Sequence, residues 1–219
     1  MNTKLFKFLL FTVSLCSFQS LANDIPIKNT IATDANLVSP LLIGQQIPDV
    51  TLWTPQGKPF ALKDAVARKP TILLFYRGGW CPFCNAQLSQ IQMIEKDLSQ
   101  LGYQLLAISP DTPDALQMTS RDKDLSYQLI SDFQLAASIG FGLAFNISDE
   151  YAEKMRGVGG TPVRALGDDK STLPVPAVFI VDQKGIIQFE YINPNYKVRI
   201  EPELLLTAAK ITINKQQDM

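Results

Sequence analysis

A buried-strand pattern that leads into a pair of cysteines constrains the fold of this chain more than any other feature. The segment 71–76, TILLFY, is a continuous apolar run of the kind that is buried on both faces of a sheet. Trp80-Cys81-Pro82-Phe83-Cys84 follows closely, and apolar residues then recur at spacings of three and four. The sequence therefore predicts a strand, a short turn, and an amphipathic helix over 81–101 that begins at a cysteine.

A thiol at a helix N-terminus lies where unpaired backbone N–H groups and the helix dipole stabilise an anion. The thiolate is the reactive form of cysteine in disulfide and peroxide chemistry. A bond between Cys81 and Cys84 would close a loop too short to constrain the unfolded chain greatly, so stabilisation explains the pair poorly. We therefore predict that both residues are catalytic. The sequence contains no histidine, which excludes Ser-His and Cys-His catalytic pairs and a Cys2His2 zinc site.

The N-terminus has the pattern of a secretory signal. Lys4 and Lys7 precede an apolar run that is too short to span a bilayer, and Ser20-Leu21-Ala22 offers a cleavage site. We expect residues 1–22, which include Cys16, to be removed, and the mature protein to be periplasmic or secreted. Residues 23–42 are expected to form a polar leader, and residues 43–212 one domain.

From residue 43 onward, predicted strands and helices alternate, which is typical of an α/β fold. Segment 143–173 is predicted to be irregular apart from a helical piece near 148–156. Asp132 is predicted to cap a helix that runs to Ile139. Strands are expected at 50–53, 71–76, 103–109, 127–131, 175–181 and 186–192, with further helices at 62–66 and after Asp111 and Glu201.

Four segments carry a resemblance to a known family: IGQQIPDVTLWTPQGKPFALKD, FYRGGWCPFC, SDFQLAASIG and VFIVDQKGII. Over residues 43–210 the chain resembles the alkyl hydroperoxide reductase/thiol-specific antioxidant family, within the thioredoxin superfamily. More narrowly, three segments are similar to peroxiredoxin-like proteins that keep a thioredoxin-type CxxC: FYRGGWCPFCNAQL, LPVPAVFIVD and NYKVRIEPE. The resemblance implies a thioredoxin-like fold, with a central mixed β-sheet flanked by helices and peroxiredoxin-like N-terminal strands. It implies no metal and no organic cofactor, because the cysteine pair itself carries the electrons.

The resemblance allows two assignments of the cysteines. Laid on the peroxiredoxin PxxxTxxC pattern, Cys84 is the peroxidatic residue, while Arg77 and Cys81 replace the usual proline and threonine. In that alignment, Pro176 stands where the family's arginine is expected, and Arg77 is a candidate substitute charge.

In the thioredoxin assignment, Cys81 attacks, Cys84 resolves the mixed disulfide, and Pro82 lies in the first helical turn. Pro176 would match the cis-proline loop of thioredoxins, and Phe75 takes the position of their buried acid. Trp80 is interpreted as a docking surface for a partner. The tail residues Tyr196, Arg199 and Glu201 match the family, but a strand-to-helix connection explains them equally well.

The sequence therefore predicts an exported thiol-based oxidoreductase that cycles Cys81 and Cys84, as a peroxiredoxin-like antioxidant or a protein disulfide reductase. The alternatives are a dedicated thioredoxin-dependent thiol peroxidase with Cys84 as peroxidatic residue, and a non-catalytic, disulfide-stapled binding module. The expected partners are a protein thiol donor, such as a thioredoxin-like protein or a membrane thiol reductase, and a disulfide, sulfenic acid or hydroperoxide substrate. A formal net charge of −1 without a basic patch argues against nucleic acid, and no membrane association is expected after signal removal.

Overall fold

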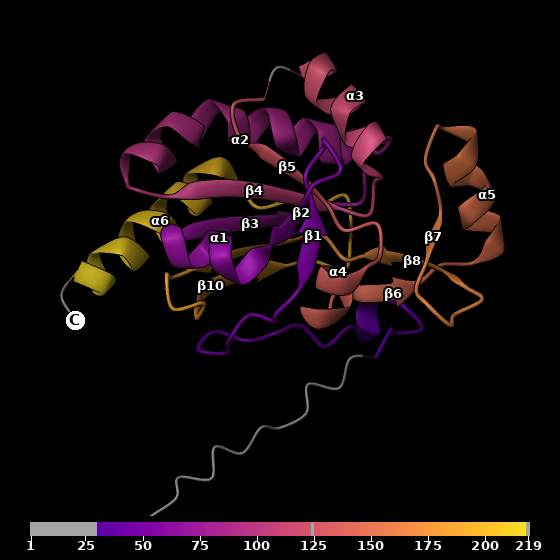
Figure 1. Ribbon diagram of the computed structural model, residues 1–219, viewed down its shortest axis with the longest axis horizontal. Coiled ribbons are helices and arrows are strands. Elements are labelled where there is room, and N and C mark those ends of the chain that lie inside the picture. The colour runs from indigo at the N-terminus through magenta and orange to yellow at the C-terminus, as the bar shows by residue number, and fades with distance from the viewer. Residues whose placement is uncertain (1–29, 124, 218–219) are drawn as a thin grey trace, which may run out of the picture.

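The central sheet has seven strands in the order β10-β9-β3-β4-β5-β1-β2 (Figure 1). The computed structural model describes residues 30–123 and 125–217. β3, β4 and β5 are parallel neighbours, whereas β9 is antiparallel to β3 and β1 to β5, so the sheet is mixed as predicted. The strands are β1 (Thr51–Trp53), β2 (Pro59–Ala61), β3 (Thr71–Phe75), β4 (Gln104–Ser109), β5 (Gln128–Ser131), β9 (Ala177–Val181) and β10 (Ile187–Ile192).

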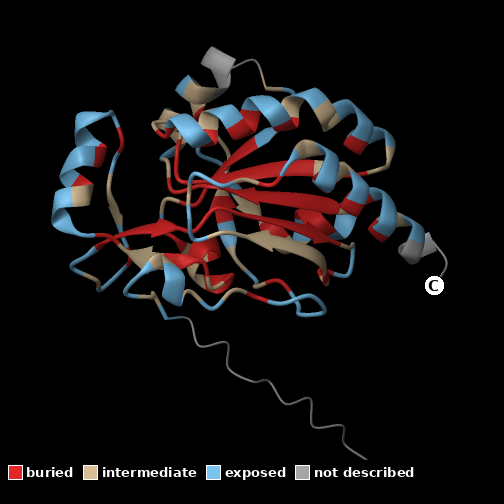
Figure 2. Ribbon diagram, turned by 180° about the vertical axis from the view of Figure 1, so that it is seen from behind, coloured by how far each residue is buried: buried red, intermediate tan, exposed pale blue. Residues whose placement is uncertain are grey.

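Helices cover both faces of this sheet, which explains why β3 and β9 are buried along their whole length. One core cluster packs Leu74 of β3 against α2, α3 and α6, and the other packs Leu73 against α1 and α4. Figure 2 shows the buried strands as the continuous centre of the molecule. The helices are α1 (Leu62–Arg68), α2 (Pro82–Gln100), α3 (Pro113–Lys123), α4 (Ala136–Gly140) and α6 (Pro202–Gln217).

The predicted cap at Asp132 is present, but the helix begins later than expected. The Asp132 carboxylate accepts hydrogen bonds from the backbone N–H groups of Ala137 (2.9 Å) and Ser138 (2.7 Å). A turn places Leu135 at the cap position itself with a φ of 61°, a left-handed conformation. The carboxylate thus satisfies the orphan donors of α4 from outside the helix.

The prediction that segment 143–173 is irregular was wrong outside its helical piece. It forms most of a second, three-stranded sheet in the order β6-β8-β7, together with α5. These strands are too short for a periodic signal, and their pairing joins residues far apart in sequence, such as Phe145 with Leu173. The elements are β6 (Ala144–Asn146), α5 (Asp149–Gly157), β7 (Val163–Arg164) and β8 (Ser171–Pro174).

The small sheet lies at the carboxyl end of β3. Chain connectivity requires this, because β8 ends at Pro174 and β9 begins at Ala177, which pairs with Phe75 at the end of β3. Figure 1 shows β6, β7, β8 and α5 at that end of the central sheet. The segment 76–81 connects β3 to α2 and ends at Cys81, and we call it the cysteine-bearing turn. This turn therefore lies between the two sheets.

Part of the expected polar leader packs on the small sheet. Ala32 bridges Phe145 of β6, and the 3-10 helix η1 (Ala35–Leu37) follows with Asp34 as its cap. The predicted signal peptide, with Cys16, lies outside the described residues. In the described part of the chain, no helix combines the length and apolar character needed to cross a membrane.

Candidate active site

Cys81 and Cys84 lie at the start of α2, as the sequence predicts. Cys81 is the N-cap residue, Pro82 occupies the first helical turn, and Cys84 follows within that turn. Proline suits this position because its missing N–H would have no helical partner. Both cysteines are free thiols, and their side chains are buried at 1% and 0% exposure. The site is thus a reduced dithiol held below the surface.

The pair is polarised. A hydrogen bond from the Cys84 thiol is the largest cause that lowers the pKa of Cys81, to about 6, and the charges of Arg77 and Arg199 act in the same direction. Burial raises the pKa of Cys84 well above its ordinary value, and its hydrogen bond to Cys81 adds to that effect. The two opposite shifts favour the thiolate on Cys81, with Cys84 as the proton-bearing partner.

Arg199 is a site residue that sequence reasoning passed over. Its Nη2 donates a hydrogen bond to Cys84 Sγ at 3.4 Å, although the two residues are 115 positions apart. Arg199 is half-buried just before α6, and its Nε and Nη1 have no hydrogen-bond partner among residues 30–123 and 125–217. The signal was the match of Tyr196, Arg199 and Glu201 to the family's tail, for which a strand-to-helix connection was an equally good explanation.

Arg77 lies in a cage of three aromatic rings. Its guanidinium carbon is 4.0 Å from the ring centroid of Tyr196, 5.0 Å from Trp80 and 5.3 Å from Tyr151. Its Nη2 donates a hydrogen bond to the Tyr151 hydroxyl, and its side chain is 3% exposed. The three rings come from the cysteine-bearing turn, from α5 and from the segment before α6. Arg77 is therefore a buried cation beside the thiolate, held by cation–π contacts.

Trp80 is half-buried, rather than projecting freely. It packs between the core beneath α2 and the small cluster of Ile147, Met155 and their neighbours. Its ring also lies on Arg77. Its suggested role as a docking surface stays a prediction, while its packing role is evident.

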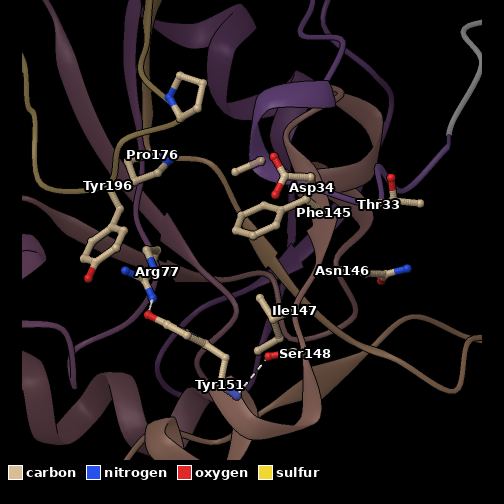
Figure 3. A pocket seen from close by; sticks show the side chains of 12 residues that line it. Thr33, Asp34, Arg77, Phe145, Asn146, Ile147, Ser148, Tyr151, Pro176 and Tyr196 are labelled. Carbon is tan, nitrogen blue, oxygen red and sulfur yellow. Dashed lines mark hydrogen bonds between the residues drawn. The ribbon is translucent and has the colours of Figure 1, made fainter.

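The cis-proline expectation for Pro176 was wrong. All peptide bonds of residues 30–123 and 125–217 are trans, including the bond before Pro176. The chain continues from β8 into β9 at this point, with the Val175 N–H bonded to the carbonyl of Leu143 in the small sheet. The extended crossover accommodates the trans isomer, which X-Pro bonds favour. Pro176 faces the cavity near Tyr196, as Figure 3 shows.

Phe75 takes the position at which thioredoxins carry a buried acid, and its side chain makes aromatic contacts in the core instead. Its ring packs against Phe141 and Phe179, with centroids 4.9 and 6.0 Å away. A half-buried carboxyl lies elsewhere, at Asp111, whose Oδ2 accepts the Gly79 N–H at 2.8 Å. Burial raises the pKa of Asp111. Asp111 thereby holds the turn that leads to the cysteines.

Gly78 shows why this turn needs glycine. Its φ is +136°, and an added Cβ would lie 2.6 Å from Trp80 Cδ1 and 2.7 Å from Asp111 Oδ1. A side chain here would clash, and the backbone conformation disfavours L-residues. Neither Gly78 nor Asp111 was predicted as a site residue from the sequence.

A cavity of about 400 Å³ lies next to Arg77, on the side of the small sheet. Figure 3 shows Arg77 between Tyr196 and Tyr151, with Phe145 and Ile147 on the opposite wall and Asp34 at the far end. The cysteines are not part of the lining. Arg77 is thus the structural link between the thiol pair and the cavity.

Comparison with known proteins decides the family. The family model described as the AhpC/TSA family matches residues 43–190. The chain belongs to the AhpC/TSA family. Among its relatives in this thioredoxin-superfamily group, peroxiredoxin Q from Populus jackii is 25% identical over 174 residues, covering 80% of this chain and 68% of the relative. The thioredoxin-like protein YneN of Bacillus subtilis is 25% identical over 161 residues, covering 74% and 78%.

Solved structures agree with the AhpC/TSA fold. The crystal structure of reduced Prx3 from Vibrio vulnificus, in complex with hydrogen peroxide, aligns with a TM-score of 0.64 at 14% identity and covers 78% of this chain and 96% of that one. Peroxidoxin BcpB from Mycobacterium tuberculosis aligns at a TM-score of 0.60 and 17% identity, covering 79% and 96%. The predicted thioredoxin-like, peroxiredoxin-like fold is therefore confirmed. AhpC/TSA membership also makes the protein a thiol-dependent oxidoreductase, which argues against the stapled binding module.

Proposed function

We propose that this protein is an exported thiol-dependent peroxidase that cycles Cys81 and Cys84 between dithiol and disulfide. The observation that carries the proposal is the polarised pair at the start of α2, where the pKa of Cys81 is lowered to about 6 beside the buried Arg77 and the half-buried Arg199. The peroxiredoxin Q relative supports a hydroperoxide as the oxidising substrate.

In the proposed cycle, the Cys81 thiolate attacks the terminal oxygen of ROOH. The S–O bond forms, the O–O bond breaks, and ROH leaves after taking a proton, so that Cys81 becomes a sulfenic acid. The Cys84 thiol then attacks the Cys81 sulfur, which forms the disulfide and releases water. A protein dithiol donor restores the pair through a mixed disulfide and is itself oxidised to a disulfide.

Arg199 and Arg77 have separate roles in this proposal. Arg199, hydrogen-bonded to Cys84 Sγ, stabilises the developing thiolate of the resolving residue. Arg77 stabilises the Cys81 thiolate through its nearby charge. Two cations beside two cysteines also offer charge stabilisation to the leaving oxygen.

A second assignment is favoured by one specific contact. Arg199 donates a hydrogen bond to Cys84 Sγ, which would stabilise a Cys84 thiolate, and the resemblance aligns Cys84 with the family's peroxidatic position. In this alternative, Cys84 is oxidised first and Cys81 resolves. Protein disulfide reduction through Cys81 is a further possibility, supported by the similarity to the thioredoxin-like protein YneN.

Single-cysteine variants test these assignments. Reduced Cys84→Ser and Cys81→Ser proteins are exposed to hydrogen peroxide, and sulfenic acid is trapped with dimedone and measured by mass. Our proposal expects rapid trapping on Cys81 in the Cys84→Ser protein and a rate close to that of free cysteine in the Cys81→Ser protein. The reverse pattern would establish Cys84 as peroxidatic. If neither variant exceeds free cysteine, but Cys84→Ser accumulates mixed disulfides, the protein is a disulfide reductase.

Export and the donor are also proposals. The basic and apolar pattern of residues 1–22 supports export, with cleavage after Ala22. The intact mass of the protein recovered from its native compartment should match a chain that begins at Asn23. A thioredoxin-like donor should restore Cys81 and Cys84 to thiols, as measured by NADPH consumption in a coupled assay.

A further inference from the structure

Arg77 has donors that nothing in the described structure accepts. Its Nη2 is bonded to Tyr151, but Nε and Nη1 are buried without a partner. The ion pairs among residues 30–123 and 125–217 do not include it. The aromatic rings contact the guanidinium face, and an arginine edge with free N–H groups is the standard partner of a carboxylate.

Among the described residues, the cavity beside Arg77 has one charged lining residue with unpartnered hydrogen-bond donors, which is Arg77 itself. Its other charged lining residue, Asp34, is exposed and accepts hydrogen bonds from the backbone and side-chain nitrogens of Asn36, at 2.8 and 2.7 Å. Asp34 and Arg77 lie at different ends of the cavity (Figure 3). The wall between them is largely apolar, with Phe145, Ile147 and Pro176. A ligand with an apolar body and one anionic end matches this lining.

We propose that this cavity binds a carboxylate with an apolar body, with the carboxylate on Arg77. The proposal deepens the proposed function, on which it rests for its biological meaning, because it names the chemistry of a molecule held beside the thiol pair. The volume of about 400 Å³ is within the range of small-molecule sites. The carboxylate belongs either to the oxidising substrate or to a small thiol reductant.

Binding requires a small rearrangement at the cage. Nε and Nη1 are shielded from solvent, so the half-buried Tyr196 ring or the Tyr151 hydroxyl must shift for the carboxylate to reach them. Trp80 lies on the same guanidinium, 5.0 Å from its carbon. Tryptophan fluorescence should therefore change when the site fills.

The test is binding of octanoate to the reduced full mature protein, by calorimetry and tryptophan fluorescence, with octanamide as the uncharged control. We expect octanoate to bind at least tenfold more tightly than octanamide. Arg77→Met should abolish that preference. Equal binding of the two compounds, or no binding of octanoate, would overturn the proposal. Because no turnover is measured, this result is independent of whether the protein is a peroxidase.

Two matched variants of Ser148 test the same site independently, in case Arg77→Met does not fold. Ser148 lines the cavity and caps α5 through its Oγ, which accepts the Tyr151 N–H at 3.2 Å. Asp and Asn serve equally well as caps, but only Asp adds a negative charge. We expect Ser148→Asp to weaken octanoate binding severalfold relative to Ser148→Asn, with octanamide unaffected. Identical octanoate affinities of the two variants would contradict the proposed site.

Kinetics then distinguish the two sources of the carboxylate. Turnover is measured with hydrogen peroxide and a protein dithiol, with a carboxylate-bearing hydroperoxide, and with a carboxylate-bearing thiol. Octanoate should compete with the reactant that shares its site. Competition with the hydroperoxide assigns the cavity to the oxidising substrate, and competition with the thiol assigns it to the reductant. Competition with neither would overturn the assignment of the cavity to a reactant.

Discussion

The start of α2 and the cage around Arg77 lie side by side but are assembled differently. The first is a contiguous stretch in which Cys81 caps the helix and Cys84 lies within its first turn. The second joins side chains from the cysteine-bearing turn, α5 and the segment before α6. Local sequence thus places the sulfur atoms, whereas long-range packing sets the charge around them. Substitutions in the two regions should separate stability from reactivity.

The largest expected effect is on the central sheet. Leu74 is buried in β3, in the cluster that includes Cys84, and truncation to alanine leaves a cavity. We expect Leu74→Ala to lower the free energy of unfolding by about 3 kcal/mol, as measured by urea denaturation. Leu204→Ala, at an exposed position of α6, serves as the control and should change it by less than about 0.5 kcal/mol. Similar losses in the two variants would contradict the packing described here.

Substitutions in the small sheet should lower the free energy of unfolding less than substitutions in the central sheet. Leu173 of β8 is buried, but its cluster contains only Ile147, Ala152 and Met155 as further buried members. We expect Leu173→Ala to lower the free energy of unfolding by about 2 kcal/mol. Amide hydrogen exchange should accelerate in β6 and α5 more than in β3, because a small cluster can open separately. Uniform acceleration across both sheets would instead show that they unfold as one unit.

Arg199 should affect reactivity without a comparable loss of stability. Its positive charge helps to lower the pKa of Cys81, so Arg199→Met should raise that pKa. We expect alkylation of Cys81 by iodoacetamide at pH 6 to slow by about fivefold. Arg199→Lys, which keeps the charge, should recover most of the rate. If the lysine variant is as slow as the methionine variant, the hydrogen bond to Cys84 matters more than the charge.

The smallest effect concerns the Tyr151 hydroxyl. In the unsubstituted protein, the Cys81 thiolate should be formed above a midpoint at about pH 6 and lost as the pH falls through it, because the lowered pKa favours the anion. Tyr151→Phe removes one acceptor of Arg77 but leaves the three rings. We expect the midpoint, followed by thiolate absorbance, to rise by less than about 0.5 pH unit. A shift above one unit would show that the hydroxyl, rather than the cage, positions Arg77.

Much of the fold could be predicted because its elements have strong local patterns. β3 and β9 are continuous apolar runs, and α2 has an apolar stripe followed by Gly102. The second sheet could not be predicted, because β6, β7 and β8 are short and depend on pairing across the chain. The conformation at Pro176 was also beyond local reasoning, since the crossover between two sheets decides it.

For the site itself, the sequence alone determined that two cysteines begin a helix after a buried strand, because strand burial, helix periodicity and N-terminal capping are local properties. Only the tertiary structure decided which charges face them. Arg199 reaches Cys84 from 115 residues away, and Arg77 is held by rings from three segments. Electrostatic interactions act over a few ångströms in space regardless of separation along the chain, so the pKa values of the pair depend on the folded arrangement.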